Sequence, residues 1–136
     1  MAKALNFDTG VVEYEVNGGA VIRFNPADTE LVKKLHNLFE KLGETQEEQA
    51  GEDVFKTLDE KDAAMRRDID GVFGEGTSAA VFGGLGLYAL AGGLPLWANF
   101  LLAVLDEVDG YVTEQQKAAS PRMAYYQQKY AKYAKK

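Results

Sequence analysis

The feature that most constrains this chain is the run of residues 79–105, which contains no charged side chain. The run is longer than the roughly 20 apolar residues with which a helix crosses a bilayer. However, five glycines and Pro95 divide it into two short pieces, and its flanks carry Glu75, Asp106 and Glu107 in place of the basic residues that mark a cytoplasmic boundary. The run therefore predicts partly buried helices joined by a glycine-rich connection, with a small membrane protein as the alternative.

A chain of 136 residues is long enough for one domain with its own core. It contains no cysteine, which excludes disulfides, thiolate metal sites and a cysteine nucleophile. The first residues, MAKALNFDTG, lack the long apolar stretch of a secretory signal peptide. We therefore expect a protein of the reducing cytoplasm and not an exported one.

Charge is distributed unevenly along the chain. Residues 117–136 carry six basic and no acidic side chains, whereas residues 1–116 carry nine basic and 21 acidic ones, a net charge of −12. An acidic body repels phosphate, so we do not expect nucleic acid as its partner. The basic tail could stack tyrosines on single-stranded bases, but it matches no nucleic-acid-binding motif. We expect instead a partly helical tail whose tyrosines pack on the body or on a neighbouring subunit: Tyr125, Tyr126, Tyr130 and Tyr133.

Residues 11–24 predict a β-hairpin followed by a helix. Two runs of β-branched and aromatic residues flank Asn17-Gly18-Gly19, and both residue types tolerate the positive φ of tight turns. Because a lone hairpin is marginal in water, it must pack on another element. Asn25 and Pro26 then predict the start of a first helix, and Gly43 its end. Its leucines recur at helical spacing and form one apolar stripe: Leu31, Leu35, Leu38 and Leu42.

Residues 44–52 are acidic and polar and form either an exposed linker or a frayed extension of the first helix. Two longer helices and one helical turn are predicted beyond them. The second helix has one apolar side, made of Val54, Phe55, Leu58, Met65, Ile69 and Val72. Residues 77–82 fit a short helical turn. Residues 83–93 fit an irregular connection rich in glycine, which is a candidate for an adjustable contact with a partner. Pro95 opens a third helix, whose wide apolar face indicates a central position: Leu96, Trp97, Phe100, Leu101, Val104, Leu105, Val108 and Val112.

The predicted fold class is mainly α (α+β). A small N-terminal hairpin, residues 11–24, packs on a bundle of about three to four helices. Residues 1–116 form a single helical domain with this hairpin, and residues 117–136 form a basic, tyrosine-rich C-terminal tail.

Residues that could carry catalysis or bind a metal are few. His36 is the only histidine, and without cysteine it would need carboxylates to coordinate a metal, so we interpret it as a boundary side chain. The only serines, Ser78 and Ser120, lie in no nucleophile motif. Acidic residues at 68–70 and 106–109 fit solvated helix positions better than a calcium loop or a catalytic carboxylate pair. We expect no enzyme activity, no catalytic residue, no cofactor and no metal site.

Three segments carry a likeness to a known family. Residues 69–78 (IDGVFGEGTS), 81–83 (VFG) and 93–101 (GLPLWANFL) resemble small proteins encoded in the tail modules of siphoviruses that infect Gram-positive bacteria. The hairpin followed by residues 25–30 (NPADTE) and the basic, tyrosine-rich end are similar too. These proteins are taken to be tail assembly chaperones, and their pattern of glycines and aromatics contains no catalytic signature.

The resemblance implies an oligomeric, non-enzymatic protein of the host cytoplasm that is absent from the mature virion. Such a protein coats the tape measure protein, keeps its long apolar helices soluble, and leaves as the tail tube polymerises, so the major tail protein is a further possible partner. The alternative is a phage-encoded adaptor or inhibitor of a host protein. We hypothesise that six residues contribute to the core and to client or self contacts: Phe73, Phe82, Leu94, Trp97, Phe100 and Leu101.

Overall fold

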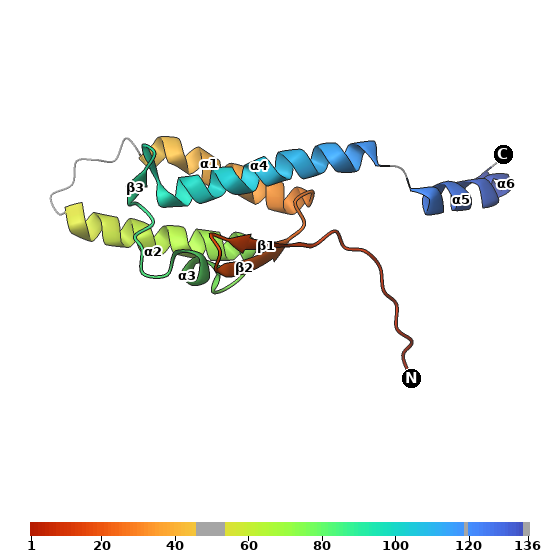
Figure 1. Ribbon diagram of the computed structural model, residues 1–136, viewed down its shortest axis with the longest axis horizontal. Coiled ribbons are helices and arrows are strands. Elements are labelled where there is room, and N and C mark those ends of the chain that lie inside the picture. The colour runs from red at the N-terminus through yellow and green to blue at the C-terminus, as the bar shows by residue number, and fades with distance from the viewer. Residues whose placement is uncertain (46–53, 119, 135–136) are drawn as a thin grey trace.

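The computed structural model describes residues 1–45, 54–118 and 120–134 (Figure 1). It is mainly helical with a small N-terminal hairpin, which confirms the predicted fold class. Most of the predicted linker at residues 44–52 lies outside the described residues. In chain order the elements are β1 (Val12–Val16), β2 (Ala20–Phe24), α1 (Thr29–Thr45), α2 (Val54–Phe73), α3 (Thr77–Phe82), β3 (Leu90–Ala91), β4 (Leu94–Pro95), α4 (Leu96–Lys117), α5 (Pro121–Lys129) and α6 (Ala131–Ala134).

The predicted hairpin is present and packs on the helices. β1 and β2 are antiparallel, and the turn places Asn17 at a φ of 51° and Gly18 at 73°, the left-handed region that these residue types favour. On the inner face, Ile22 and Phe24 are buried, and the rings of Tyr14 and Phe24 stack with centroids 4.6 Å apart. The hairpin thus buries one face, as a two-stranded sheet must to be stable.

The first helix begins at Thr29 and not at Pro26, so its predicted start is wrong. The Oδ1 atom of Asn25 accepts a hydrogen bond from the backbone N–H two residues on, at 2.7 Å, and thereby closes a turn. Its Nδ2 atom donates to the carbonyl of Thr9 at 2.8 Å. Asp28 takes the capping role instead, because its Oδ1 accepts from the N–H two residues on at 3.0 Å. The helix also continues past Gly43 to Thr45.

Three long helices surround the core. Figure 1 shows α1 and α4 side by side and running in opposite directions, with α2, α3 and the hairpin against them. The third long helix has the central role predicted for it, since the described part of α4 buries five side chains, against three on α1 and two on α2. Among the described residues, the hydrophobic core cluster contains Ile22, Phe24, Leu31, Leu35, Leu38, Met65, Ile69, Phe82, Leu87, Trp97, Ala98, Leu101, Val104 and Val108. Burying a large apolar side chain stabilises a fold by about 1.5–3 kcal/mol.

The segment at residues 83–93 is more ordered than predicted. It contains β3, which pairs with β4 through Leu90 opposite Pro95 and Ala91 opposite Leu94. The turn between them uses Gly92 and Gly93 at positive φ, 62° and 83°. No helix within the described ranges is long and apolar enough to span a bilayer.

The two ends of the chain extend from this body (Figure 1). The N-terminal arm is fixed only near residue 10, where the hydroxyl of Tyr111 donates to the carbonyl of Gly10 at 3.4 Å. At the other end, Ser120 caps α5 by accepting the N–H of Met123 at 3.1 Å. Every described side chain from 120 to 133 is exposed, so the tail tyrosines do not bury against the body.

Candidate partner-binding surface

The six predicted partner residues lie in or against the core. Phe82, Trp97 and Leu101 are buried, with at most 6% of their surface exposed. The other three, Phe73, Leu94 and Phe100, are half-buried against them. Their expected core role is confirmed, whereas their contact with a partner stays a prediction. In this conformation the three buried side chains are not accessible to a partner protein.

Three of these rings form one cluster beneath the hairpin. Phe73 and Phe100 are edge to face at 5.5 Å, Phe82 and Phe100 at 5.6 Å, and Phe73 also meets Phe24 of β2 at 5.4 Å. Edge-to-face pairs at these distances add stability beyond the area that they bury. The aromatic pattern of the sequence therefore joins α2, α3, α4 and the hairpin.

Trp97 sits apart from that cluster, in the first turn of α4. It is 1% exposed, and its ring packs edge to face on Tyr88 at 6.3 Å. Its indole Nε1 has no hydrogen-bond acceptor within the described part of the chain. A buried donor without a partner costs about 1–3 kcal/mol, so this indole is held by packing alone.

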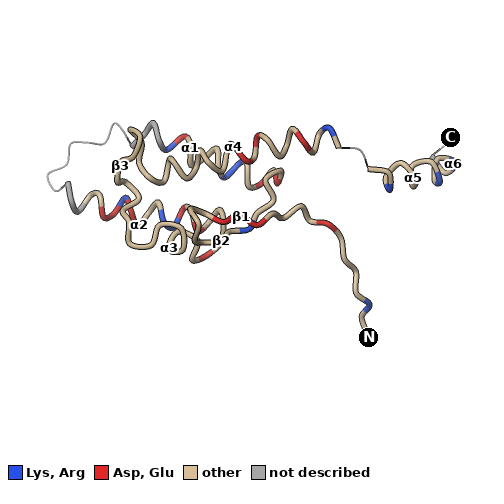
Figure 2. The backbone as a smooth tube through the Cα atoms, viewed as in Figure 1, with Lys and Arg blue, Asp and Glu red and all other residues tan. Residues whose placement is uncertain are grey.

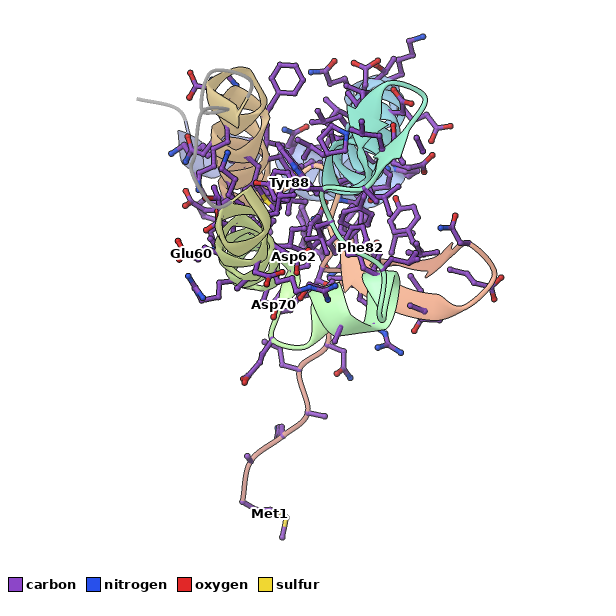
Figure 3. All side chains as sticks on the ribbon, turned by 90° about the vertical axis from the view of Figure 1, so that its left-hand side faces the viewer. Met1, Glu60, Asp62, Asp70, Phe82 and Tyr88 are labelled. Atoms are coloured by element: carbon purple, nitrogen blue, oxygen red, sulfur yellow. The ribbon has the colours of Figure 1, made fainter. Side chains whose placement is uncertain are left out.

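Two charged residues of α2 position the glycine-rich loop at residues 83–89. Asp62 accepts hydrogen bonds from the backbone N–H of Leu87 at 2.7 Å and from Nε of Arg66 at 2.8 Å. The Arg66 guanidinium in turn donates to the carbonyl of Leu85 at 2.7 Å. Figure 3 shows Asp62 on the inner side of α2 and Glu60 on the opposite side. These bonds hold Leu87 completely buried while Leu85 stays exposed.

Among the described side chains of the helical body, five large apolar ones remain exposed, and we call them the apolar set: Phe39, Leu58, Leu85, Leu90 and Leu102. They belong to α1, α2, the loop before β3, β3 itself and α4. In Figure 1 the end of α1, the start of α2, β3 and the start of α4 all lie at the same end of the molecule. Exposed large apolar side chains on neighbouring elements are candidates for contact with a protein partner.

The sequence indicated this surface only in part. Residues 83–93 were expected to form an adjustable contact, and Leu90, 74% exposed, agrees with that expectation. Phe39 and Leu58 lie on helices whose apolar stripes predicted burial, yet both are exposed. An apolar stripe that is wider than the helix contact leaves the residues at its border in solvent. The side chains of Leu42, Val54 and Phe55 lie outside the described part of the molecule.

A second apolar surface lies between the hairpin and α4. This hairpin groove has a volume of about 200 Å³, and its wall is made of Tyr14, Val16, Ile22, Phe24, Phe100, Ala103 and Val104. Glu107 of α4 also lines it, whereas Glu15 pairs with Val21 on the outer face of the hairpin. Burial raises the pKa of the Tyr14 hydroxyl, and the negative charge of Glu107 raises it further.

The acidic and histidine side chains considered for catalysis or metal binding form local hydrogen bonds and ion pairs. Asp70 accepts the N–H of Ser78 at 2.8 Å, which fixes the first turn of α3. Asp68 forms an ion pair with Lys41 of α1. His36 is exposed on α1 and lies 3.8 Å from a carboxylate oxygen of Glu40. Across the described ranges, no three such side chains converge on a point where they could hold a metal ion.

No family model, curated protein or solved structure matches the chain. We therefore infer the function of this protein from the surfaces described above and from the resemblance found in its sequence.

Proposed function

We propose that this protein is a siphovirus tail assembly chaperone, which binds the tape measure protein and keeps it soluble until the tail tube polymerises around it. The observation that supports this proposal is the apolar set, whose large side chains stay exposed on a well-packed body. An apolar helix is recognised by side chains of this kind, spaced across neighbouring elements. The protein acts by contact and not by catalysis.

The charge of the body suits this role. Acidic side chains are spread over the hairpin and all three long helices (Figure 2). A body with a net charge of −12 stays soluble when an apolar client occupies part of its surface, because loaded copies repel one another. We place this activity in the host cytoplasm, before the virion is complete.

The proposal moves the client contact from the predicted residues to the apolar set. Because Trp97 and Leu101 are core residues, Trp97→Ala and Leu101→Asp would destabilise the fold and would report on stability instead of binding. Phe39 and Leu90 are 43% and 74% exposed, so a charge can be placed there without opening the core.

The test is co-expression with the tape measure protein encoded nearby, scored by the soluble fraction of that protein. We expect wild type to raise this fraction and Phe39→Asp/Leu90→Asp to lose most of the effect. Val21→Asp is the matched control, because Val21 is an exposed apolar residue on the outer face of β2. If the double variant folds and still solubilises the tape measure protein as well as the control does, the proposal fails.

The alternative of an adaptor or inhibitor uses the same surface on a host protein. The position of the gene separates the two functions, since a chaperone gene would lie beside tail genes. A chain that leaves the tape measure protein insoluble but co-purifies with one host protein is an adaptor or inhibitor.

A further inference from the structure

The N-terminal arm, residues 1–10, carries large apolar side chains that the body of the molecule does not cover. Leu5 and Phe7 are 87% and 74% exposed. They alternate with the polar Asn6 and Asp8, so in an extended chain both apolar side chains lie on one face. Such alternation is typical of a strand that buries one face against a partner. The arm thus has the sequence pattern of a strand, but it pairs with no strand in the described part of the chain.

Hydrogen bonds at the base of the arm direct it away from the body. The Nδ2 of Asn25 donates to the carbonyl of Thr9 at 2.8 Å, and the hydroxyl of Tyr111 donates to the carbonyl of Gly10 at 3.4 Å. The Oδ1 of Asp8 accepts the N–H of Gly10 at 2.8 Å, which closes a turn with a positive φ of 74° at Gly10. From this turn the rest of the arm leads away from the hairpin and from α4 (Figure 1). The arm is therefore presented to a neighbouring molecule.

The hairpin offers a site for an added strand. β1 pairs with β2, and β2 packs on α2 and α3, so the other edge of β1 has no strand partner within the described ranges. A free strand edge presents N–H and C=O groups that pair readily with another chain. On the inner face of β1, Tyr14 and Val16 line the hairpin groove. A strand added beside β1 would therefore direct every second side chain toward this groove.

The size and the charge of the hairpin groove suit the aromatic side chain of the arm. The volume of about 200 Å³ gives room for about one ring, and Phe7 is the only aromatic residue of the arm. Phe100 of the groove wall belongs to the aromatic cluster beneath the hairpin, so a docked ring would extend that cluster. Residues 1–7 contain Lys3 and no acidic side chain, whereas Glu107 lines the groove. The arm therefore approaches this carboxylate without repulsion.

We propose that the N-terminal arm of one copy adds as a strand to the free edge of β1 in a second copy, with the ring of Phe7 in the hairpin groove. Backbone hydrogen bonds along β1 give this contact its affinity, and the ring gives it its specificity. Each copy then gives one arm and receives one. The contact does not depend on the identity of the client.

The test is sedimentation of the full chain over a range of concentrations. We expect the mass to rise with concentration and the association to persist at about 1 M salt, which screens charges, because the contact is mainly apolar. Phe7→Ala should raise the Kd of self-association about tenfold or more, because the groove loses its occupant. Ala103→Phe should do the same, because Ala103 is exposed and lines the groove, so that the new ring fills the groove within each copy.

Two matched controls should leave the Kd unchanged. Val21→Ala removes an exposed apolar side chain from the outer face of the hairpin, away from the groove. Ala80→Phe adds a ring at an exposed position of α3. Circular dichroism checks that all four variants keep the helical content of wild type.

Three results would overturn the proposal. The first is a chain that stays monomeric over the whole range, and the second is an association that is lost at high salt, because charge and not the ring would then hold the copies together. The third is self-association that Phe7→Ala and Ala103→Phe leave unchanged. If Ala103→Phe loses the tape measure protein but still self-associates, the groove belongs to the client, and the proposed function stands while the contact between copies fails.

Discussion

Asp62 of α2 accepts a hydrogen bond from the backbone N–H of Leu87 at 2.7 Å, across 25 positions of the chain. The same carboxylate binds Arg66, whose guanidinium holds the carbonyl of Leu85. Side chains of one helix therefore hold a backbone N–H and a backbone carbonyl of the loop at residues 83–89, which contains three glycines. These contacts keep the side chain of Leu87 buried and that of Leu85, two residues earlier, exposed.

The first prediction concerns this contact. Asp62→Ala leaves the N–H of Leu87 and the guanidinium of Arg66 without their acceptor, so we expect the free energy of unfolding to fall by about 1–3 kcal/mol. Urea denaturation measures this change, and hydrogen exchange should be faster at Leu87. Glu60→Ala, on the opposite side of α2, is the control and should stay within about 0.5 kcal/mol of wild type. Equal stability of the two variants would show that the loop does not depend on Asp62.

The second prediction concerns Trp97. Trp97→Ala removes the largest fully buried side chain, so we expect the free energy of unfolding to fall by about 3–5 kcal/mol. Trp97→Phe should cost less, because a ring still fills most of the site and the Nε1 donor without an acceptor is removed. Thermal unfolding by circular dichroism compares the two. A Trp97→Phe variant as unstable as Trp97→Ala would mean that the indole N–H has an acceptor after all.

Tyr14 predicts a loss of stability at high pH. Burial, and then the charges of Glu107 and Tyr111, raise the pKa of this phenol above its ordinary value of 10.0. The unfolded chain therefore releases the proton first, so the contribution of Tyr14 is complete below pH 10 and is lost as the pH rises through the higher folded pKa. As the pH rises above the ordinary value of 10.0, wild type should lose more unfolding free energy than Tyr14→Phe. Tyr125→Phe, in the exposed tail, should behave as wild type does, and a parallel decline in all three chains would contradict the assignment.

The sequence predicts elements where local chemistry decides them. Pro95 and the wide apolar face after it define α4, and Asn17-Gly18 defines the hairpin turn. The start of α1 was missed because Asn25 and Asp28 can both cap a helix: the Oδ1 of Asn25 closes a turn, and Asp28, three residues later, caps α1. Likewise, helical spacing identifies Phe39 as apolar but does not tell whether a neighbouring helix covers it. Helical periodicity therefore predicts which residues form the core. The exposed apolar residues can be identified only once the packing of the helices is known.

The last prediction separates core from surface within the same loop. Leu87 and Leu90 are both leucines of the glycine-rich segment, yet Leu87 is fully buried and Leu90 is 74% exposed. Leu87→Ala should lower the free energy of unfolding by about 2–5 kcal/mol, because it leaves a cavity between α2 and α4. Leu90→Asp should change it by less than about 0.5 kcal/mol, since its side chain already lies in water. Urea denaturation of both variants checks this difference. If Leu90→Asp is as unstable as Leu87→Ala, Leu90 is part of the core, and a loss of client binding in that variant reflects unfolding.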